Sequence, residues 1–243
     1  MMKASRVPLI GVLLIGVLWF PALARAQQRP AIADQIAKTY GFDSWGQVEA
    51  IRYTFHLDAG KLQLHRSWVW EPKTDQITYD GPDKDGKPVK ITYRRSELAN
   101  QSAFVKEMVD PGFFNDQYWL LFPFHLIWDT GATIQDAGMQ KLPLGKGSAR
   151  KVVVQYPSSG GYHPGDAWAL FVGPDNQIRE LAFKFGGSAK PGGFLATWEG
   201  YKKAGPVLVS TEHRGKADGN PFKAHLSNVA VKLAGSDRWM EAK

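Results

Sequence analysis

The chain of 243 residues contains no cysteine. This absence excludes disulfide bonds, a thiol nucleophile and every metal centre that needs cysteine ligands. The sequence also lacks a P-loop, a dinucleotide-binding fingerprint, an H-E-x-x-H zinc motif and the G-x-S-x-G elbow of a serine hydrolase. We therefore predict that the protein is not an enzyme and that it binds no cofactor and no metal.

A strong charge of one sign is absent as well. The 30 basic and 23 acidic side chains give a net charge of +7, and they are scattered along the chain. The densest basic group consists of Lys141, Lys146, Arg150 and Lys151. A nucleic-acid interface needs basic residues clustered on one face, so we exclude nucleic acid as a partner.

Long apolar runs are also missing. The run from Leu9 to Phe20 has 12 residues, whereas a helix that spans a bilayer needs about 20. The run follows a basic start and precedes Ala24-Arg25-Ala26, which is the pattern of a secretory signal peptide. We expect cleavage after Ala26 to remove residues 1–26 and to leave residues 27–243 as a periplasmic or secreted protein with no stable membrane span. An uncleaved anchor is the alternative.

Aromatic residues, in contrast, make up 12% of the chain. Apolar and polar side chains alternate in residues 51–58 and 61–70, as in strands, and Ala59-Gly60 between them indicates a hairpin turn. Pairing of residue 58 with residue 61 would place Phe55 opposite Leu64. One face of this hairpin is apolar apart from one arginine, and we predict it to be the wall of a ligand cavity, formed by Tyr53, Phe55, Leu64, Arg66, Trp68 and Trp70.

The alternating pattern recurs up to residue 232 in short segments, separated by turns rich in Gly and Pro. This spacing predicts one antiparallel sheet of about ten or eleven strands rather than a series of βαβ units. A sheet of that size must curl, close or split. No change in composition marks a linker, so we expect residues 27–243 to form a single domain that is mainly β with some α (α+β), with a short helix at residues 31–40.

A helical segment interrupts the strands at about residues 96–128. Seven of the 16 residues from 113 to 128 are aromatic, so another part of the protein must cover them. Two roles are compatible with each other: a helix that fills the mouth of the sheet as ordinary core, and a lid over an apolar cavity. For the lid we predict Tyr118, Trp119, Leu120, Phe122 and Phe124.

Two stretches of sequence carry a resemblance to a known family. Trp68-Val69-Trp70-Glu71-Pro72 resembles the W-V-x-R-P stretch of the LolA/LolB-like superfamily of lipoprotein carriers, and residues 115–124 resemble an uncharacterised branch of lipoprotein-sorting-like proteins. The order of leader, helix, hairpin, helical insertion and further strands is also similar. The resemblance implies a strongly curved, incomplete antiparallel barrel with helices over its opening, whose concave apolar face receives acyl chains.

The chain departs from that family at one position. The carriers have a basic residue before the proline, which helps to couple lid closure to ligand release, whereas this chain has Glu71. Arg66 is the basic residue on the predicted apolar face. Because a buried arginine is costly unless it is paired, we expect a partner such as Glu71, a lid carbonyl or a ligand head group. Alternatively, Arg66 extends to water at the sheet edge.

The histidines give no clear site. The predicted register puts His56 and His65 diagonally across the polar face of the hairpin, where surface histidines are the simpler interpretation. His125 and Asp129 are four residues apart, but Pro123 weakens a helix there. His163 falls in a Gly-rich loop.

Together these features favour an exported soluble protein that binds an apolar ligand, either a lipid or the acyl chain of a lipoprotein. It would act as a carrier or chaperone, with the ligand in the concave face of a half-barrel. A first alternative is an envelope sensor or scaffold of the same fold that binds protein partners without a lipid. A second is a hydrolase that uses His125 or His163 with a nearby carboxylate.

Overall fold

The computed structural model describes residues 29–162, 164–186 and 192–243, and the predicted signal peptide and His163 lie outside them. The helical elements are α1 (Ala31–Thr39), η1 (Phe42–Gln47), η2 (Arg95–Asn100), η3 (Val105–Val109) and α2 (Asp110–Trp128). The strands are β1 (Val48–Ala59), β2 (Leu62–Glu71), β3 (Gln76–Pro82), β4 (Pro88–Arg94), β5 (Thr133–Lys141), β6 (Ser148–Gln155), β7 (Ala167–Val172), β8 (Ile178–Lys184), β9 (Gly193–Thr197), β10 (Glu199–Ala204), β11 (Val207–Ala217), β12 (Asn220–Leu233) and β13 (Trp239–Glu241).

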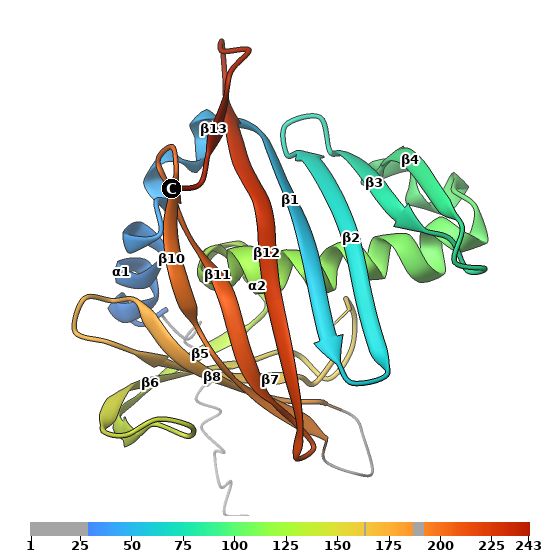
Figure 1. Ribbon diagram of the computed structural model, residues 1–243. Helices are drawn as coiled ribbons and strands as arrows, with labels where there is room; N and C mark the ends of the chain where they lie inside the picture. Colours follow the sequence, from blue (N-terminus) through green and yellow to red (C-terminus); the bar gives the residue numbers. More distant parts are fainter. Residues whose placement is uncertain (1–28, 163, 187–191) are drawn as a thin grey trace, which may run out of the picture.

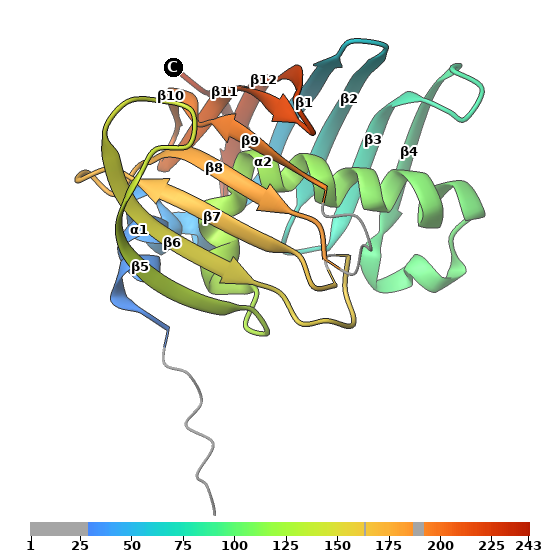
Figure 2. The same ribbon diagram turned by 90° about the horizontal axis from the view of Figure 1, so that it is seen from below.

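The described strands form one 13-stranded sheet. Its order is β4-β3-β2-β1-β12-β11-β9-β8-β7-β6-β5, with β10 added on β11 and β13 added on β12. Neighbouring strands are antiparallel, and the two ends of this path, β4 and β5, do not pair with each other among the described residues. The sheet bends strongly around a central helix (Figures 1 and 2). The predicted fold class, a mainly antiparallel and incomplete barrel, is confirmed.

The structure has two more strands than the upper predicted number of eleven. One addition arises because residues 193–204 are divided at Trp198 into β9 and β10, and the Trp198 N–H donates to the Arg179 carbonyl at 2.8 Å. Beyond this point Gly200 has a φ of +67°, and the chain continues as β10 along β11 alone. The other addition, β13, has three residues, too few to show an alternating pattern.

The first hairpin is shifted by two residues from the predicted register. Ala59 pairs with Leu62, so Gly60-Lys61 forms the turn and Phe55 lies opposite Arg66 rather than Leu64. The φ of +69° at Gly60 suits the first central position of a type II′ turn, and the Asp58 carboxylate accepts the Gly60 N–H at 3.2 Å. A shift of two residues keeps every side chain on its predicted face, because the strand period is two.

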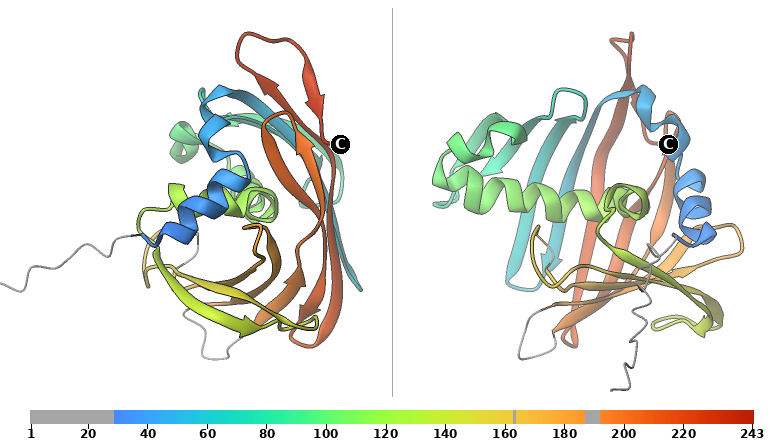
Figure 3. Two further views of the ribbon diagram at one scale, coloured as in Figure 1. Left: turned by 90° about the vertical axis from the view of Figure 1, so that its left-hand side faces the viewer. Right: turned by 180° about the vertical axis from the view of Figure 1, so that it is seen from behind.

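Helix α2 lies on the concave side of the sheet and crosses its strands (Figure 3). Side chains on all sides of this helix are buried, as expected for a helix enclosed by other elements. The helix bends at Leu121, where φ is −118° and ψ is 18°, two residues before Pro123. Ile32 and Ile36 of α1 are buried in the same core. No described helix is long and apolar enough to cross a membrane.

Candidate functional site

The predicted cavity wall lies on the face of β1 and β2 that meets α2. Tyr53, Phe55 and Trp68 are buried, whereas Trp70 is half-buried. The rings of Trp68 and Trp70 lie 5.6 and 5.7 Å from that of Phe113 in α2. Leu64 is half-buried near the hairpin turn, opposite Leu57. This wall therefore packs directly on the helix.

The predicted lid residues contact other parts of the sheet. Tyr118, Trp119, Leu120, Phe122 and Phe124 are all buried. The Trp119 ring stacks at 5.2 Å on Phe194 of β9, and the Phe122 ring lies 4.6 Å from Trp168 of β7. On another side of α2 the Phe124 ring lies 5.2 Å from Trp45 of η1. The lid and the wall predicted from the sequence therefore meet through other residues of α2, among them Phe113 and Asp116.

Arg66 has a buried partner on α2. Its Nε donates to Asp116 Oδ2 at 2.8 Å and its Nη2 donates to Oδ1 at 2.5 Å. Trp68 Nε1 and Asn115 Nδ2 donate to the same carboxylate, at 2.8 and 3.0 Å. Burial raises the pKa of the Asp116 carboxyl, while the Arg66 guanidinium and these donors act in the opposite direction. Glu71, which was one of the partners predicted for Arg66, instead accepts hydrogen bonds from Thr74 and Gln76.

Two more carboxylates tie the ends of α2 to the sheet. Asp110 is fully buried and accepts hydrogen bonds from Tyr93 Oη at 2.7 Å, from Arg95 Nε at 3.2 Å and from the Tyr162 hydroxyl. Sequence analysis missed Asp110 and Asp116. Both lie on a helical segment rich in aromatic residues, and a carboxylate in such a segment was the available signal.

Asp129, just beyond the end of α2, is the third carboxylate. It accepts hydrogen bonds from the hydroxyls of Tyr118 and Tyr156 at 2.6 and 2.7 Å, and His125 Nδ1 lies 3.1 Å away. Burial alone would raise the pKa of Asp129, but the bonds from His125 and the two tyrosines lower it. His125 itself is enclosed by aromatic rings, including Tyr118 at 3.8 Å and Trp128 at 5.2 Å.

Three cavities lie along α2. The aromatic cavity, of about 350 Å³, lies between α2 and strands β7 to β9 and is lined by Trp168, Phe183 and Phe194 among others. The tyrosine cavity, also of about 350 Å³, is lined by Tyr118, Tyr156 and Tyr162. The tryptophan cavity, of about 330 Å³, is lined by Trp45, Trp70 and Trp128. Each reaches the lower end of the size range typical of ligand pockets.

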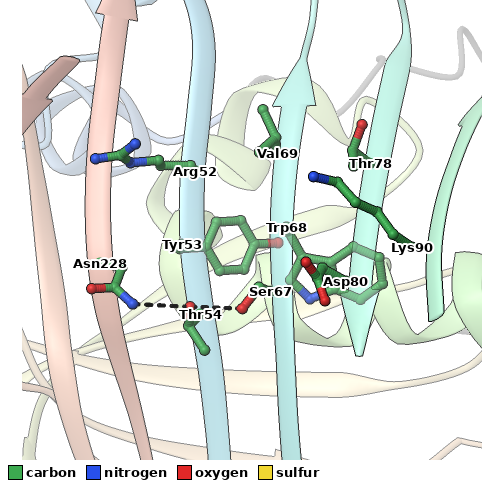
Figure 4. A pocket seen from close by; sticks show the side chains of 10 residues that line it. All are labelled: Arg52, Tyr53, Thr54, Ser67, Trp68, Val69, Thr78, Asp80, Lys90 and Asn228. Carbon is green, nitrogen blue, oxygen red and sulfur yellow. Dashed lines mark hydrogen bonds between the residues drawn. The ribbon is translucent and has the colours of Figure 1, made fainter. Parts of the chain in front are cut away.

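A smaller depression lies on the opposite, outer face of the hairpin (Figure 4). Its volume is about 140 Å³, and much of its lining is polar, including Arg52, Asp80 and Lys90. Thr54 Oγ1 and Ser67 Oγ are hydrogen-bonded there at 2.9 Å. A hollow of this size is below the range of ligand pockets, so we do not consider it a candidate site.

The histidines on the outer face are closer together than predicted. His56 lies directly opposite His65 rather than diagonal to it, because of the two-residue register shift, and their ring centroids are 4.6 Å apart. His225 of β12 stacks on the other side of His56 at 4.1 Å. Burial, with His225 and His65 nearby, lowers the pKa of His56 to about 4. In the described part of the chain, no three or more His, Asp or Glu side chains are placed to hold a metal ion.

Comparison with known proteins gives similarity in structure alone. No family model and no characterised protein sequence matches this chain. A DUF1329 family protein from Desulfovibrio piger is similar in structure, with a TM-score of 0.49, 10% identity, and coverage of 85% of this chain and 94% of that one.

Two further solved structures are similar at lower scores. A domain assigned as an outer membrane lipoprotein-sorting protein, from Vibrio parahaemolyticus, gives a TM-score of 0.45 at 6% identity and covers 84% of this chain and 95% of that one. The lipoprotein LppX of Mycobacterium tuberculosis gives 0.31 at 10%, covering 82% and 95%. These likenesses concern the course of the chain and not its ligand.

Proposed function

We propose that this protein is exported and carries an apolar chain, either that of a lipid or the acyl chain of a lipoprotein, between α2 and the concave face of its sheet. The observation that carries the proposal is the aromatic cavity. It is lined by Trp119 and Phe194 in addition to Trp168 and Phe183, and it lies under a helix that itself is enclosed by the sheet. The aromatic side chains supply apolar surface for an acyl chain, while Asn115 and Asp166 add polar groups to the same lining.

The physical work of such a carrier is to keep an apolar chain out of water. Burial of apolar surface is worth about 25 cal/mol per Å², so sheltering a few hundred Å² of acyl chain supplies several kcal/mol. The rigid aromatic walls add to this, because they lose little side-chain entropy when a ligand enters.

The charged side chains near the cavities are already paired, which favours binding of an uncharged portion of a ligand. Asp110 pairs with Arg95 at 3.2 Å, Asp116 pairs with Arg66, and Asp129 is 3.1 Å from His125. Each carboxylate near α2 thus has a local hydrogen-bonding partner. A charged head group would have to compete with these pairs, whereas an acyl chain would not.

A specific observation favours the second candidate, a sensor or scaffold that binds protein partners. The predicted wall is already covered, because Trp68 and Trp70 pack on Phe113. In this candidate the side chains around α2 leave no room for an apolar ligand, and they form a filled core on the concave side of the sheet. Its exposed apolar side chains, such as Phe185 and Met139, would then be the contact points.

Native and denaturing mass spectrometry distinguish the two candidates. We would purify the mature chain, residues 27–243, from an envelope extract and compare its two masses. The carrier proposal expects an extra mass that is lost on denaturation and is recovered as lipid in an organic extract. A bare mass, together with no uptake of a decanoyl probe by the purified protein, would reject the carrier and favour the scaffold. Partners would then be sought by cross-linking.

A further inference from the structure

Phe114 occupies the meeting point of the three cavities along α2. It lines the aromatic, the tyrosine and the tryptophan cavities. Its neighbour Phe113 lines the tryptophan cavity, but lines neither of the other two. The half-buried Phe114 is therefore the residue that the linings of all three cavities have in common.

Two groups outside the strands, Arg95 of η2 and Tyr162 between β6 and β7, contact this ring. The Arg95 guanidinium lies 4.2 Å from the centre of the Phe114 ring, and the Tyr162 ring lies 4.6 Å from it. A cation over an aromatic face is attracted to the π electrons. Arg95 and Tyr162 both donate to the buried Asp110 carboxylate. One buried carboxylate thus positions both groups that contact Phe114.

The volume of each cavity limits the length of the apolar chain that it can hold. Each of the three spaces has about 330 to 350 Å³, so a chain confined to one of them has about a third of the space that all three hold together. An apolar chain that extends from one cavity towards the next meets a wall to which Phe114 contributes. Its further methylenes must then remain in water or displace the ring.

We propose that Phe114 is a specificity-determining residue that sets the longest apolar chain the protein accepts. This inference rests on the proposed function, since it concerns the same apolar ligand. Each buried methylene contributes about 0.8 kcal/mol, which corresponds to about a fourfold gain in affinity per methylene. Affinity therefore rises with chain length while the cavity fills, and stops rising at the length where the chain reaches Phe114.

The test measures binding of acyl methyl esters of increasing length, from octanoyl to stearoyl, by displacement of an apolar fluorescent probe from the mature protein. Removal of the ring in Phe114→Ala joins the cavities, so the length at which affinity stops rising moves to longer chains. Two additional accommodated methylenes correspond to more than about tenfold tighter binding of the longer ester. The wider ring in Phe114→Trp moves the limit to shorter chains.

Phe104→Ala is the matched control, because Phe104 is also half-buried and packs on the core but lines none of the three cavities. The proposed role of Phe114 as a gate between the cavities is supported if the chain length at which affinity stops rising increases in Phe114→Ala and is unchanged in Phe104→Ala. An unchanged limit in Phe114→Ala, or an equal change in Phe104→Ala, overturns it while the carrier function stands. If Phe114→Ala does not fold, a shorter limit in Phe114→Trp supports the gate, and an unchanged or longer limit overturns it. Failure of the wild type to bind any ester overturns the carrier proposal and the gate together.

Discussion

Arg66 of β2 and Asp116 of α2 form a two-pronged ion pair beneath the sheet, in which the aspartate is fully buried and the arginine side chain is 17% exposed. The pair joins the hairpin that carries the predicted cavity wall to the helix that carries the predicted lid. Trp68, itself part of the wall, donates to the same carboxylate. Any movement of α2 away from β2 must therefore separate opposite charges and leave a buried tryptophan N–H without its acceptor.

Loss of one partner from this pair should be strongly destabilising. Arg66→Gln leaves the Asp116 charge buried without its cation, and we expect a loss of about 3 kcal/mol in the free energy of unfolding, measured by urea denaturation. Arg150→Gln is the control, because it breaks an exposed pair with Asp136 and should cost less than about 1 kcal/mol. Equal losses in the two variants would show that the buried pair does not hold α2 in place.

The stability of the fold should fall in acid because of a buried histidine. His213 is fully buried beside Trp119 and Trp198, and burial lowers its pKa to about 3. In the unfolded chain its pKa is about 6.5. The stabilisation is therefore complete above about pH 6.5 and is lost as pH falls towards the folded pKa, because only the unfolded state takes up the proton.

This linkage predicts a loss of about 2 kcal/mol in the free energy of unfolding between pH 7 and pH 5 from His213. His56, with its pKa lowered to about 4, adds a loss in the same direction. Urea unfolding at both pH values would measure the difference in the wild type and in His213→Gln. The variant should show a smaller loss, and a pH dependence identical to that of the wild type would contradict the assignment.

A glycine between α1 and η1 should tolerate no side chain. Gly41 has a φ of +94°, and a Cβ atom there would lie 2.2 Å from the Pro206 carbonyl oxygen. Gly41→Ala should lower the thermal midpoint and cost more than about 2 kcal/mol, since left-handed backbone alone costs a residue with a side chain about 1–2 kcal/mol. Gly46→Ala, where a Cβ meets no atom within 4 Å, should change stability by less than about 1 kcal/mol. Similar effects of the two substitutions would contradict this prediction.

The local pattern predicted the strands of the first hairpin well, but it predicted their register less well. Alternation placed Tyr53, Phe55 and Trp68 on the buried face, and the two-residue shift of the hairpin did not move them off it. The shift could not be read from the pattern, because period-two alternation is the same in both registers. Only the turn geometry at Gly60 distinguishes them.

The candidate site was harder to predict because its contacts are distant in sequence. Arg66 and Asp116 are 50 residues apart, and Trp119 meets Phe194 across a further 75 residues of chain. The aromatic content of residues 113–128 predicted that this helix would be covered. It could not predict that Trp119 and Phe122 would face β9 and β7, because apolar side chains lie on every side of α2 and no periodicity selects one face.

The last prediction concerns the lid itself. Trp119 lines the aromatic cavity, and Phe122 supports Trp168, which lines it too. The double variant Trp119→Leu, Phe122→Leu keeps these positions apolar but removes the rings that close the cavity. We expect it to release a bound decanoyl probe faster than the wild type, by about tenfold or more, because the lost ring contacts amount to more than about 1.4 kcal/mol.

Phe124→Leu provides the control for that experiment, since Phe124 is equally enclosed in α2 but its ring contacts Phe42, Trp45 and Trp128 on another side of the helix. It should lower stability while leaving the release rate near that of the wild type. Stopped-flow fluorescence measures the rates, and circular dichroism shows that each variant is folded. A folded double variant that retains the probe as long as the wild type would argue against the lid, because closure would then not depend on the rings that α2 places over the cavity.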